Sequence, residues 1–220
     1  MIRDFMFFLP TRIIFGRNAS ERIGEIALEM GFANMLVVTD EGFSRIPVFR
    51  KIIDRISDAG IRCRVFNRLK KEPDTEIAEQ GAEFLKSEQT DCLLGIGGGS
   101  AMDLAKALSV LGTNKGKVAE YLGVDLVKKP PLPLLVVPTT AGSGSEVTRV
   151  AVLSDRKKKS KAGIVSPFIP PRTAILDPVL LTTLPSTVIA ETGIDALSHA
   201  IESFYSLGSN PVSDIMAKES

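Results

Sequence analysis

The chain has 220 residues, of which 44% are hydrophobic and 24% are charged. This is the ordinary balance of a globular protein, and the length is sufficient for one domain and part of a second. The 27 basic and 26 acidic residues leave a formal net charge of +1. Because neither sign dominates, the charge gives no reason to expect nucleic acid or a membrane surface as a partner.

The two cysteines and the first ten residues give information on the cellular location of the protein. Cys63 and Cys92 each lie in a short apolar run, and neither belongs to a C-x-x-C pair. We therefore expect buried, reduced thiols rather than a disulfide or a metal site. The N-terminal stretch is interrupted by Asp4 and ended by Pro10, and no small-residue cleavage site follows, which argues against a signal peptide. No apolar stretch approaches the length of a membrane span. We expect a cytoplasmic protein.

Most of the chain alternates between helical and strand patterns. The opening differs, because FMFFL and RIIFG flank Pro10-Thr11 and predict an N-terminal β-hairpin. Four helices are then predicted, over residues 20–30 with Ser20 as N-cap, 43–59, 74–86 and 101–111. Four apolar runs predict strands, over residues 35–38, 62–66, 91–97 and 132–138. Apolar strands separated by amphipathic helices indicate β-α-β units, and hence an α/β fold whose parallel sheet is covered on both faces.

The pattern changes near residue 178, where strand-like runs disappear. A long helix is predicted from about Ser186, and a second one begins after Pro211. We therefore divide the chain into an α/β domain, residues 1–182, and the beginning of an all-helical domain, residues 183–220.

A glycine-rich turn follows the third apolar run. A strand ends in Gly97, Gly98 and Gly99, and a helix begins at once. Glycines let a ligand approach the backbone, and a helix N-terminus offers unpaired N–H groups and partial positive charge, so the segment suits a pyrophosphate. It departs from the common G-x-G-x-x-G fingerprint, because Ser100 stands where the third glycine would fall. A tight turn without a ligand is the simpler alternative.

Asp40 ends the strand-like segment LVVTD. A carboxylate at the C-terminal end of a strand can accept hydrogen bonds from a ribose, and it would repel a 2′-phosphate. In the common dinucleotide fold this acid follows the glycines, whereas Asp40 precedes them. Either Asp40 caps the next helix, or the topology is not the common one. For the residue taken alone, the cap is the better interpretation.

The fourth apolar run leads into PTTAGSGSEVT, residues 138–148, which concentrates hydroxyl side chains at Thr139, Thr140, Ser143, Ser145 and Thr148. Ligands of parallel sheets bind at the carboxyl ends of the strands, so these hydroxyls are predicted to face the binding cleft. The alternative is a flexible Ser/Gly turn.

The helix predicted from Ser186 carries Asp195 and His199, the only histidine of the chain. Residues four apart share one helical face, where a carboxylate oxygen and an imidazole nitrogen can chelate one divalent metal ion. Without further context, such a pair is more often simply hydrogen-bonded.

Taken together, GGGSAMDLAK, PTTAGSGSEVT and GIDALSHAIES resemble the iron-containing (group III) alcohol dehydrogenase family, and they occur in that family's order. The resemblance implies a Rossmann-like N-terminal domain for NAD(P), a C-terminal helical domain, and an active site in the cleft between them. It places Asp40 at the adenosine ribose, which favours NAD over NADP. For the rest of the cofactor it implies Gly97, Gly98, Gly99 and Ser100 at the pyrophosphate, Asp103 close by, Thr139, Thr140, Ser143 and Thr148 along the cofactor path, and Lys161 near the nicotinamide ribose.

The resemblance also implies a metal and a reaction. Asp195 and His199 would be two of four ligands to iron, with zinc as the alternative, and no other side chain is expected to be catalytic. The family's remaining ligands are downstream histidines that this chain lacks, so we interpret it as a truncated or split dehydrogenase. The implied reaction is hydride transfer between a small-molecule alcohol or aldehyde and NAD, with the metal polarising the alcohol oxygen. The complete protein is expected to be a homo-oligomer.

One departure and several alternatives accompany this interpretation. The family usually has an Asn-Pro turn near the adenine, and here Glu72-Pro73 takes its place. A zinc-dependent polyol dehydrogenase or a dehydroquinate synthase shares the superfold, but PTTAGSGSE followed by D-x-x-x-H fits the alcohol dehydrogenases better. From a different class, the chain would be an inactive fragment that acts only as a dinucleotide-binding module.

Overall fold

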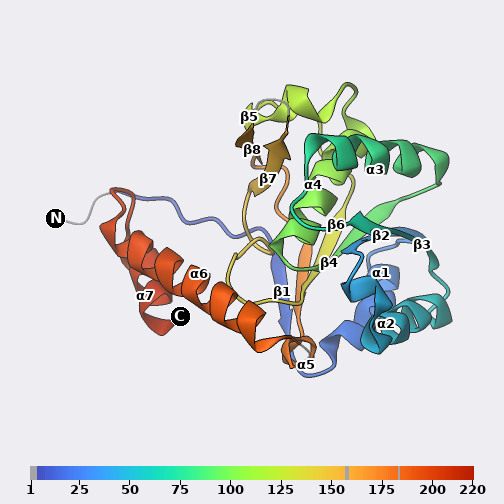
Figure 1. The fold of residues 1–220 in the computed structure, drawn as a ribbon, viewed down its shortest axis with the longest axis horizontal. Coiled ribbons are helices and arrows are strands. Elements are labelled where there is room, and N and C mark those ends of the chain that lie inside the picture. The colour runs from blue at the N-terminus through green and yellow to red at the C-terminus, as the bar shows by residue number, and fades with distance from the viewer. Residues whose placement is uncertain (1–3, 157–158, 183) are drawn as a thin grey trace.

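A parallel sheet forms the centre of the protein, seen in a computed structural model that describes residues 4–156, 159–182 and 184–220 (Figure 1). The sheet has six strands in the order β1-β9-β6-β4-β2-β3, and every neighbouring pair is parallel. The strands are β1 (Arg12–Phe15), β2 (Asn34–Asp40), β3 (Arg62–Leu69), β4 (Cys92–Gly97), β6 (Leu134–Pro138) and β9 (Thr173–Leu176). The predicted α/β fold is confirmed.

Helices cover both faces of this sheet because its central strands are apolar on both sides. Leu36 and Val38 of β2 join one core with α3 (Thr75–Ser87) and α4 (Gly99–Thr113). The alternate residues Met35 and Val37 join the other core with α1 (Ile23–Glu29) and α2 (Pro47–Asp58). Figure 1 shows the two helix pairs on opposite sides of the sheet.

The strand order places a topological switch point between β2 and β4. From β2 the chain runs through α2 to β3 on one side, and it then returns through α3 to β4 on the other side. Helices that leave neighbouring strands toward opposite faces open a crevice at the carboxyl ends of those strands, where ligands of such sheets bind. In this chain the strand ends at that crevice are Asp40 and Gly97.

A second, smaller sheet lies beside α4. It contains β5 (Gly123–Val124), β8 (Ser160–Val165) and β7 (Val150–Asp155), and β7 and β8 pair as an antiparallel hairpin. No strand was expected from the sequence after residue 138. The hairpin strands are short and partly exposed, so they lack the continuous apolar run that marks the central strands.

The prediction of an N-terminal β-hairpin is wrong. Residues 4–10 form no strand, and β1 pairs in parallel with β9, with Arg12 opposite Thr173. Pro10 has no N–H to donate to a ladder, and the partner that β1 finds is distant in sequence. The prediction that Ser20 caps a helix is also wrong. Helix α1 begins only at Ile23, after a short 3₁₀ turn, η1 (Ala19–Arg22). The Ser20 hydroxyl instead donates to Asp177 Oδ2 at 2.6 Å.

Both cysteines carry free thiols, as expected. Cys63 on β3 and Cys92 on β4 both pair with Met35 of the strand between them. Two strand spacings of about 4.8 Å each separate them, which is too far for a disulfide. Cys92 is buried and Cys63 is half-buried, and burial raises the pKa of the Cys63 thiol to about 11.

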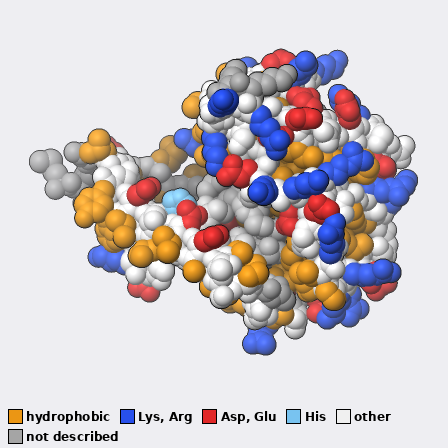
Figure 2. Space-filling view, viewed as in Figure 1, with side chains coloured by type: hydrophobic (Ala, Val, Ile, Leu, Met, Phe, Trp, Pro, Cys, Tyr) orange, Lys and Arg blue, Asp and Glu red, His pale blue; other side chains and the backbone are white. Residues whose placement is uncertain are grey.

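The last two helices project from the body of the protein (Figure 1). α6 (Ser186–Tyr205) and α7 (Pro211–Glu219) lie wholly within the described residues, and neither has a buried residue. They follow α5 (Pro178–Leu181), and both helices were predicted. Figure 2 shows exposed hydrophobic side chains over this projecting part. They are Ile189, Ile194, Leu197, Ile201, Phe204 and Tyr205 on α6, and Ile215 and Met216 on α7. Within the described part of the chain, no helix combines the length and apolar character that crossing a membrane requires.

Candidate functional site

The crevice at the switch point brings Asp40 against the glycine turn, residues 97–99. Gly97 has φ +147°, a conformation that side-chain-bearing residues rarely adopt, and a Cβ there would lie 3.2 Å from Asp40 Oδ2. Asp40 Oδ1 accepts a hydrogen bond from Phe43 N at 2.8 Å, at the start of the 3₁₀ turn η2 (Phe43–Arg45). Asp40 therefore accepts from the first N–H of η2, although Gly42 is the N-cap residue of that turn, and the topology also differs from the common dinucleotide fold. The two alternatives do not exclude each other.

The hydroxyl loop, residues 139–148, packs against the same turn. A Cβ on Gly98 would lie 3.5 Å from Thr140 Oγ1, and one on Gly99 would lie 2.8 Å from Ser143 Oγ. Thr139 N donates to Gly97 O at 2.9 Å and ties the end of β6 to the end of β4. Gly98 is the N-cap of α4, so the first N–H groups of that helix lie in this turn. The first N–H groups of any α-helix have no carbonyl partner within the helix. Amide donors, hydroxyls and a carboxylate thus converge at one strand edge.

A buried lysine holds the hydroxyl loop to α4. Lys106 has no exposed surface, and its Nζ donates to Ser145 Oγ at 3.0 Å, to Thr148 Oγ1 at 3.0 Å and to Val150 O at 2.7 Å. Asp103, one turn earlier, accepts from Ser145 Oγ at 2.6 Å and from Val152 N at 3.0 Å. The Asp103 and Lys106 side chains therefore fix the second half of the loop and the start of β7.

Lys106 was not recognised from the sequence as part of the site, although a signal was present. It stands within a helix segment that is otherwise apolar and buried, and a charged group in such a position requires partners. Burial lowers the pKa of Lys106 from 10.5 to about 8, and the charges of Asp103 and Glu146 oppose this shift.

Lys161 lies near the glycine turn, but it is paired with Glu72. Lys161 Nζ is 2.6 Å from Glu72 Oε1, and both residues border a cavity of about 130 Å³ with Ser100 and Asp103. The family resemblance implies that Lys161 lies near the nicotinamide ribose, and it puts the family's Asn-Pro turn, which is Glu72-Pro73 in this chain, near the adenine. Two residues in direct contact cannot lie at opposite ends of a dinucleotide. Glu72 and Lys161 both lie on the Ser100 side of the glycine turn, whereas Asp40 lies beside Gly97.

Asp195 and His199 form a pair on α6. His199 Nδ1 is 3.9 Å from Asp195 Oδ2, and both side chains are about half exposed. In the described residues, no group of three or more His, Cys, Asp and Glu side chains is arranged to hold a metal ion. This chain therefore offers two donors on one helical face, which is fewer than a tight divalent site normally uses.

A backbone contact joins α6 to the hydroxyl loop. A Cβ on Gly142 would lie 2.5 Å from the carbonyl oxygen of Thr192. Thr192 is one turn before Asp195 on the same helix, so the loop and the Asp195–His199 pair are brought near each other through this contact.

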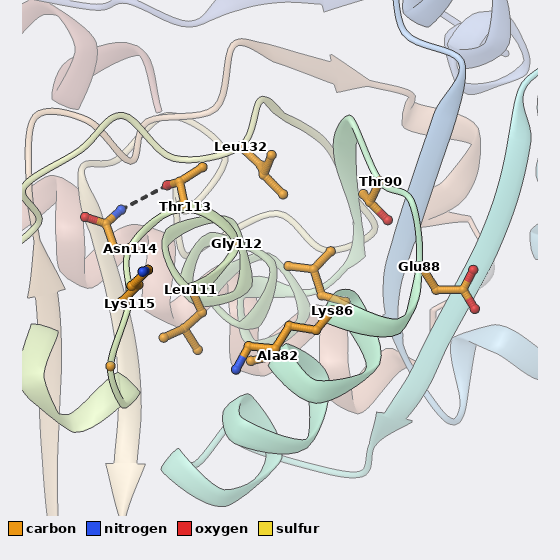
Figure 3. A pocket seen from close by; sticks show the side chains of 12 residues that line it. Ala82, Lys86, Glu88, Thr90, Leu111, Gly112, Thr113, Asn114, Lys115 and Leu132 are labelled. Carbon is orange, nitrogen blue, oxygen red and sulfur yellow. Dashed lines mark hydrogen bonds between the residues drawn. The ribbon is translucent and has the colours of Figure 1, made fainter.

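A larger cavity, of about 420 Å³, lies elsewhere (Figure 3). Its walls come mainly from the C-terminal ends of α3 and α4 and the residues that follow them, among them Lys86, Glu88, Thr113 and Asn114. The end of α4 is remote from the strand ends where that helix begins, so this cavity is not at the edge where ligands of parallel sheets bind. The candidate site is the switch-point crevice.

Comparisons with known proteins bear on the family and the fold of the chain. A family model described as iron-containing alcohol dehydrogenase matches residues 10–178. The chain is 37% identical over 212 residues to the NAD-dependent methanol dehydrogenase of Bacillus methanolicus, a match that covers 96% of this chain and 55% of that protein. The chain spans about half the length of the curated relatives it matches.

Two solved structures are similar over nearly the whole chain. A crystal structure of 1,3-propanediol oxidoreductase has a TM-score of 0.93 and 35% identity, over 98% of this chain and 56% of that one. Sulfoacetaldehyde reductase from Bifidobacterium kashiwanohense, in complex with NAD+, has a TM-score of 0.90 and 36% identity, over 98% of this chain and 57% of that one.

The buried Lys106 predicts a pH dependence of stability. Between about pH 8 and 10.5, Lys106 is protonated in the unfolded chain and increasingly neutral in the folded chain. The unfolded state then binds more protons, so this group makes the free energy of unfolding rise with pH. We expect the wild-type protein to gain stability relative to Lys106→Met across this window, measured by urea unfolding at several pH values. All other titratable groups are common to the two proteins, so their contributions cancel in the difference. A difference that stays constant with pH would contradict the assignment.

Proposed function

This chain belongs to the iron-containing alcohol dehydrogenase family, and on that premise we propose that it binds NAD and contributes to hydride transfer between a small alcohol or aldehyde and that cofactor. The observation that carries the proposal is the convergence of Asp40, the glycine turn and the hydroxyl loop at the switch point. Family, fold and strand-edge chemistry all favour a dinucleotide there.

The glycine turn and the start of α4 fit a pyrophosphate. The space beside Gly98, between the turn and Thr140, is one that a Cβ would enter, and the positive end of the α4 dipole faces it. The residues proposed to hold the cofactor are Asp40, Gly97, Gly98, Gly99, Ser100, Asp103, Thr139, Thr140, Ser143, Thr148 and Lys161. Asp103 and Thr148 act mainly by fixing neighbouring groups, because their side chains are engaged in the Lys106 network.

We assign the preference for NAD to Asp40. Its Oδ1 is held by Phe43 N, which leaves Oδ2 directed at the glycine turn. A fixed carboxylate in this position accepts hydrogen bonds from ribose hydroxyls and repels a 2′-phosphate.

Asp195 and His199 are proposed to supply two ligands to a divalent metal ion, iron with zinc as the alternative. When bound, the ion supplies a Lewis acid for the substrate oxygen, and NAD supplies the hydride acceptor. The carboxylate and the imidazole share one face of α6 and have compatible chemistry for such an ion. No other side chain of the chain is assigned a catalytic role.

We further propose that residues 1–182 form the dinucleotide domain and residues 183–220 the beginning of a helical one. The exposed apolar side chains of α6 support this division, because such a surface normally packs against further structure. The second candidate function is a dinucleotide-binding module without turnover. It is favoured by the presence of two metal donors, and no third, in the described residues.

The first test separates folding from binding at neighbouring glycines. Gly98 has φ −73°, and its Cβ would make only ordinary contacts, so Gly98→Ala should fold with a change of within about 1 kcal/mol but lose NADH binding. Gly97→Ala should be destabilised by about 1–3 kcal/mol, because of its positive φ and a 2.7 Å approach to Ala101 Cβ. Thermal unfolding and NADH fluorescence titration measure both. Unchanged binding by Gly98→Ala would remove the turn from the site.

The second test concerns cofactor preference. The native chain should bind NADH more tightly than NADPH, and Asp40→Gly should reduce that preference by about tenfold or more. Asp40→Asn is the matched variant, because it removes the charge and keeps an oxygen that can accept from Phe43 N. Equal or tighter binding of NADPH by the native chain would show that Asp40 does not select the cofactor.

The third test concerns the metal. With two donors, the 220-residue chain should bind Fe²⁺ or Zn²⁺ weakly and form no NADH from short primary alcohols or diols. A chain extended by a family C-terminal helical region should regain both properties, and His199→Ala in it should abolish them. The measurements are metal content after gel filtration and an NADH-formation assay. Stoichiometric metal and turnover in the 220-residue chain would refute the ligand set, as would full activity of the extended His199→Ala protein.

A further inference from the structure

Glu72 is held in place by the backbone around it. The turn between β3 and α3 is joined to the β7–β8 hairpin by a hydrogen bond from Ser154 N to Pro73 O at 2.9 Å. Asp74, the N-cap of α3, adds an ion pair with Arg156, with Oδ2 and Nε 2.5 Å apart. Both contacts directly follow Glu72 in sequence, and they fix the turn relative to the β7–β8 hairpin.

Each oxygen of the Glu72 carboxylate has a partner on the β7–β8 hairpin. Oε1 is 2.6 Å from Lys161 Nζ, and Oε2 accepts from Ser154 Oγ at 3.3 Å. The hydrogen bond and the charge of Lys161 lower the pKa of Glu72, so this carboxyl is ionised at neutral pH. Both partners are more than half exposed, and the pair can therefore open into solvent at small cost.

The charges around the adjoining cavity are unfavourable for a phosphate. Two carboxylates, Glu72 and Asp103, and one ammonium, Lys161, border it beside Ser100. Asp103 is occupied by Ser145 and Val152. Glu72 thus holds the one cation among the described residues that line this cavity, at the side of the glycine turn where an anionic ligand would approach.

We propose that Glu72 sets the affinity of this chain for its dinucleotide by competing with the bound cofactor for Lys161. This inference rests on the proposed function and adds a specificity-determining residue to it. Binding requires the Glu72–Lys161 pair to open, and the carboxylate that remains then repels the anionic ligand. A neutral side chain at position 72 removes both effects.

The experiment is NADH titration, followed by fluorescence, of the wild type, Glu72→Gln, Lys161→Met and the double variant. Glu72→Gln should tighten binding by about two- to fivefold, the range of a single exposed ion pair. Lys161→Met should weaken NADH binding. Adding Glu72→Gln to Lys161→Met should increase the affinity for NADH less than Glu72→Gln does in the wild type, because no ammonium is left to release. Glu88→Gln is the control away from the site, since it removes the same charge from a partly buried ion pair with Arg64 on β3, at 3.2 Å, and should leave the Kd unchanged.

The outcomes separate this inference from the function on which it rests. If the wild type binds NADH and Glu72→Gln binds equally or more weakly, Glu72 is not a competitor, and weaker binding would make it a direct ligand. An equal gain from Glu72→Gln with and without Lys161 would also overturn the inference, because the effect would not pass through that lysine. If the wild type binds no NADH at all, the proposed function fails and this inference fails with it.

Discussion

The candidate site depends on the order of the central strands in the sheet. Because the chain passes from β2 to β3 on one side and to β4 on the other, the connections leave β2 and β4 toward opposite faces. A crevice at the carboxyl ends of these two strands follows from that connectivity. Asp40 and Gly97 meet there only because β2 and β4 are neighbours, although many residues separate them in sequence. The hydroxyl loop reaches the same place because β6 pairs with β4 on the other side.

Much of this arrangement could be predicted from residues whose signals are local. Apolar runs such as that of β4, and helices such as α3 with its Asp74 cap, carry their patterns within a short window. Parallel pairing of β1 with β9, and the β7–β8 hairpin, could not be predicted in the same way. β1 is an edge strand whose partner is remote in sequence, and β8 begins in a lysine-rich stretch that is typical of a loop. For these elements tertiary pairing outweighs local preference.

The candidate site shows the same division. The cofactor roles expected for Asp40 and the glycine turn came from the family resemblance, because each feature taken alone also fitted a helix cap or a tight turn. Which glycine carries the backbone constraint was not recognisable, and it is Gly97 rather than Gly98 that has the positive φ. Lys106 was missed because its role depends on three acceptors that come from the loop after β6 and the start of β7. The Glu72–Lys161 pair likewise joins two segments that only the fold brings together.

The close approach of Gly142 to Thr192 shows how backbone packing positions the hydroxyl loop against the helix that carries Asp195 and His199. The atom that a Cβ would approach to 2.5 Å is a backbone carbonyl oxygen of α6, so no rotation of a side chain can relieve the clash. Gly142 has no positive φ, so the requirement for glycine there arises from the neighbouring helix and not from its own conformation. Asp195 and His199 follow Thr192 on the same rigid helix. Any residue larger than glycine at position 142 would therefore displace either the hydroxyl loop, which is anchored by Lys106, or the helix that carries the proposed metal ligands. Because the loop is fixed by buried hydrogen bonds and α6 has no buried residues, the helix is the part that would move.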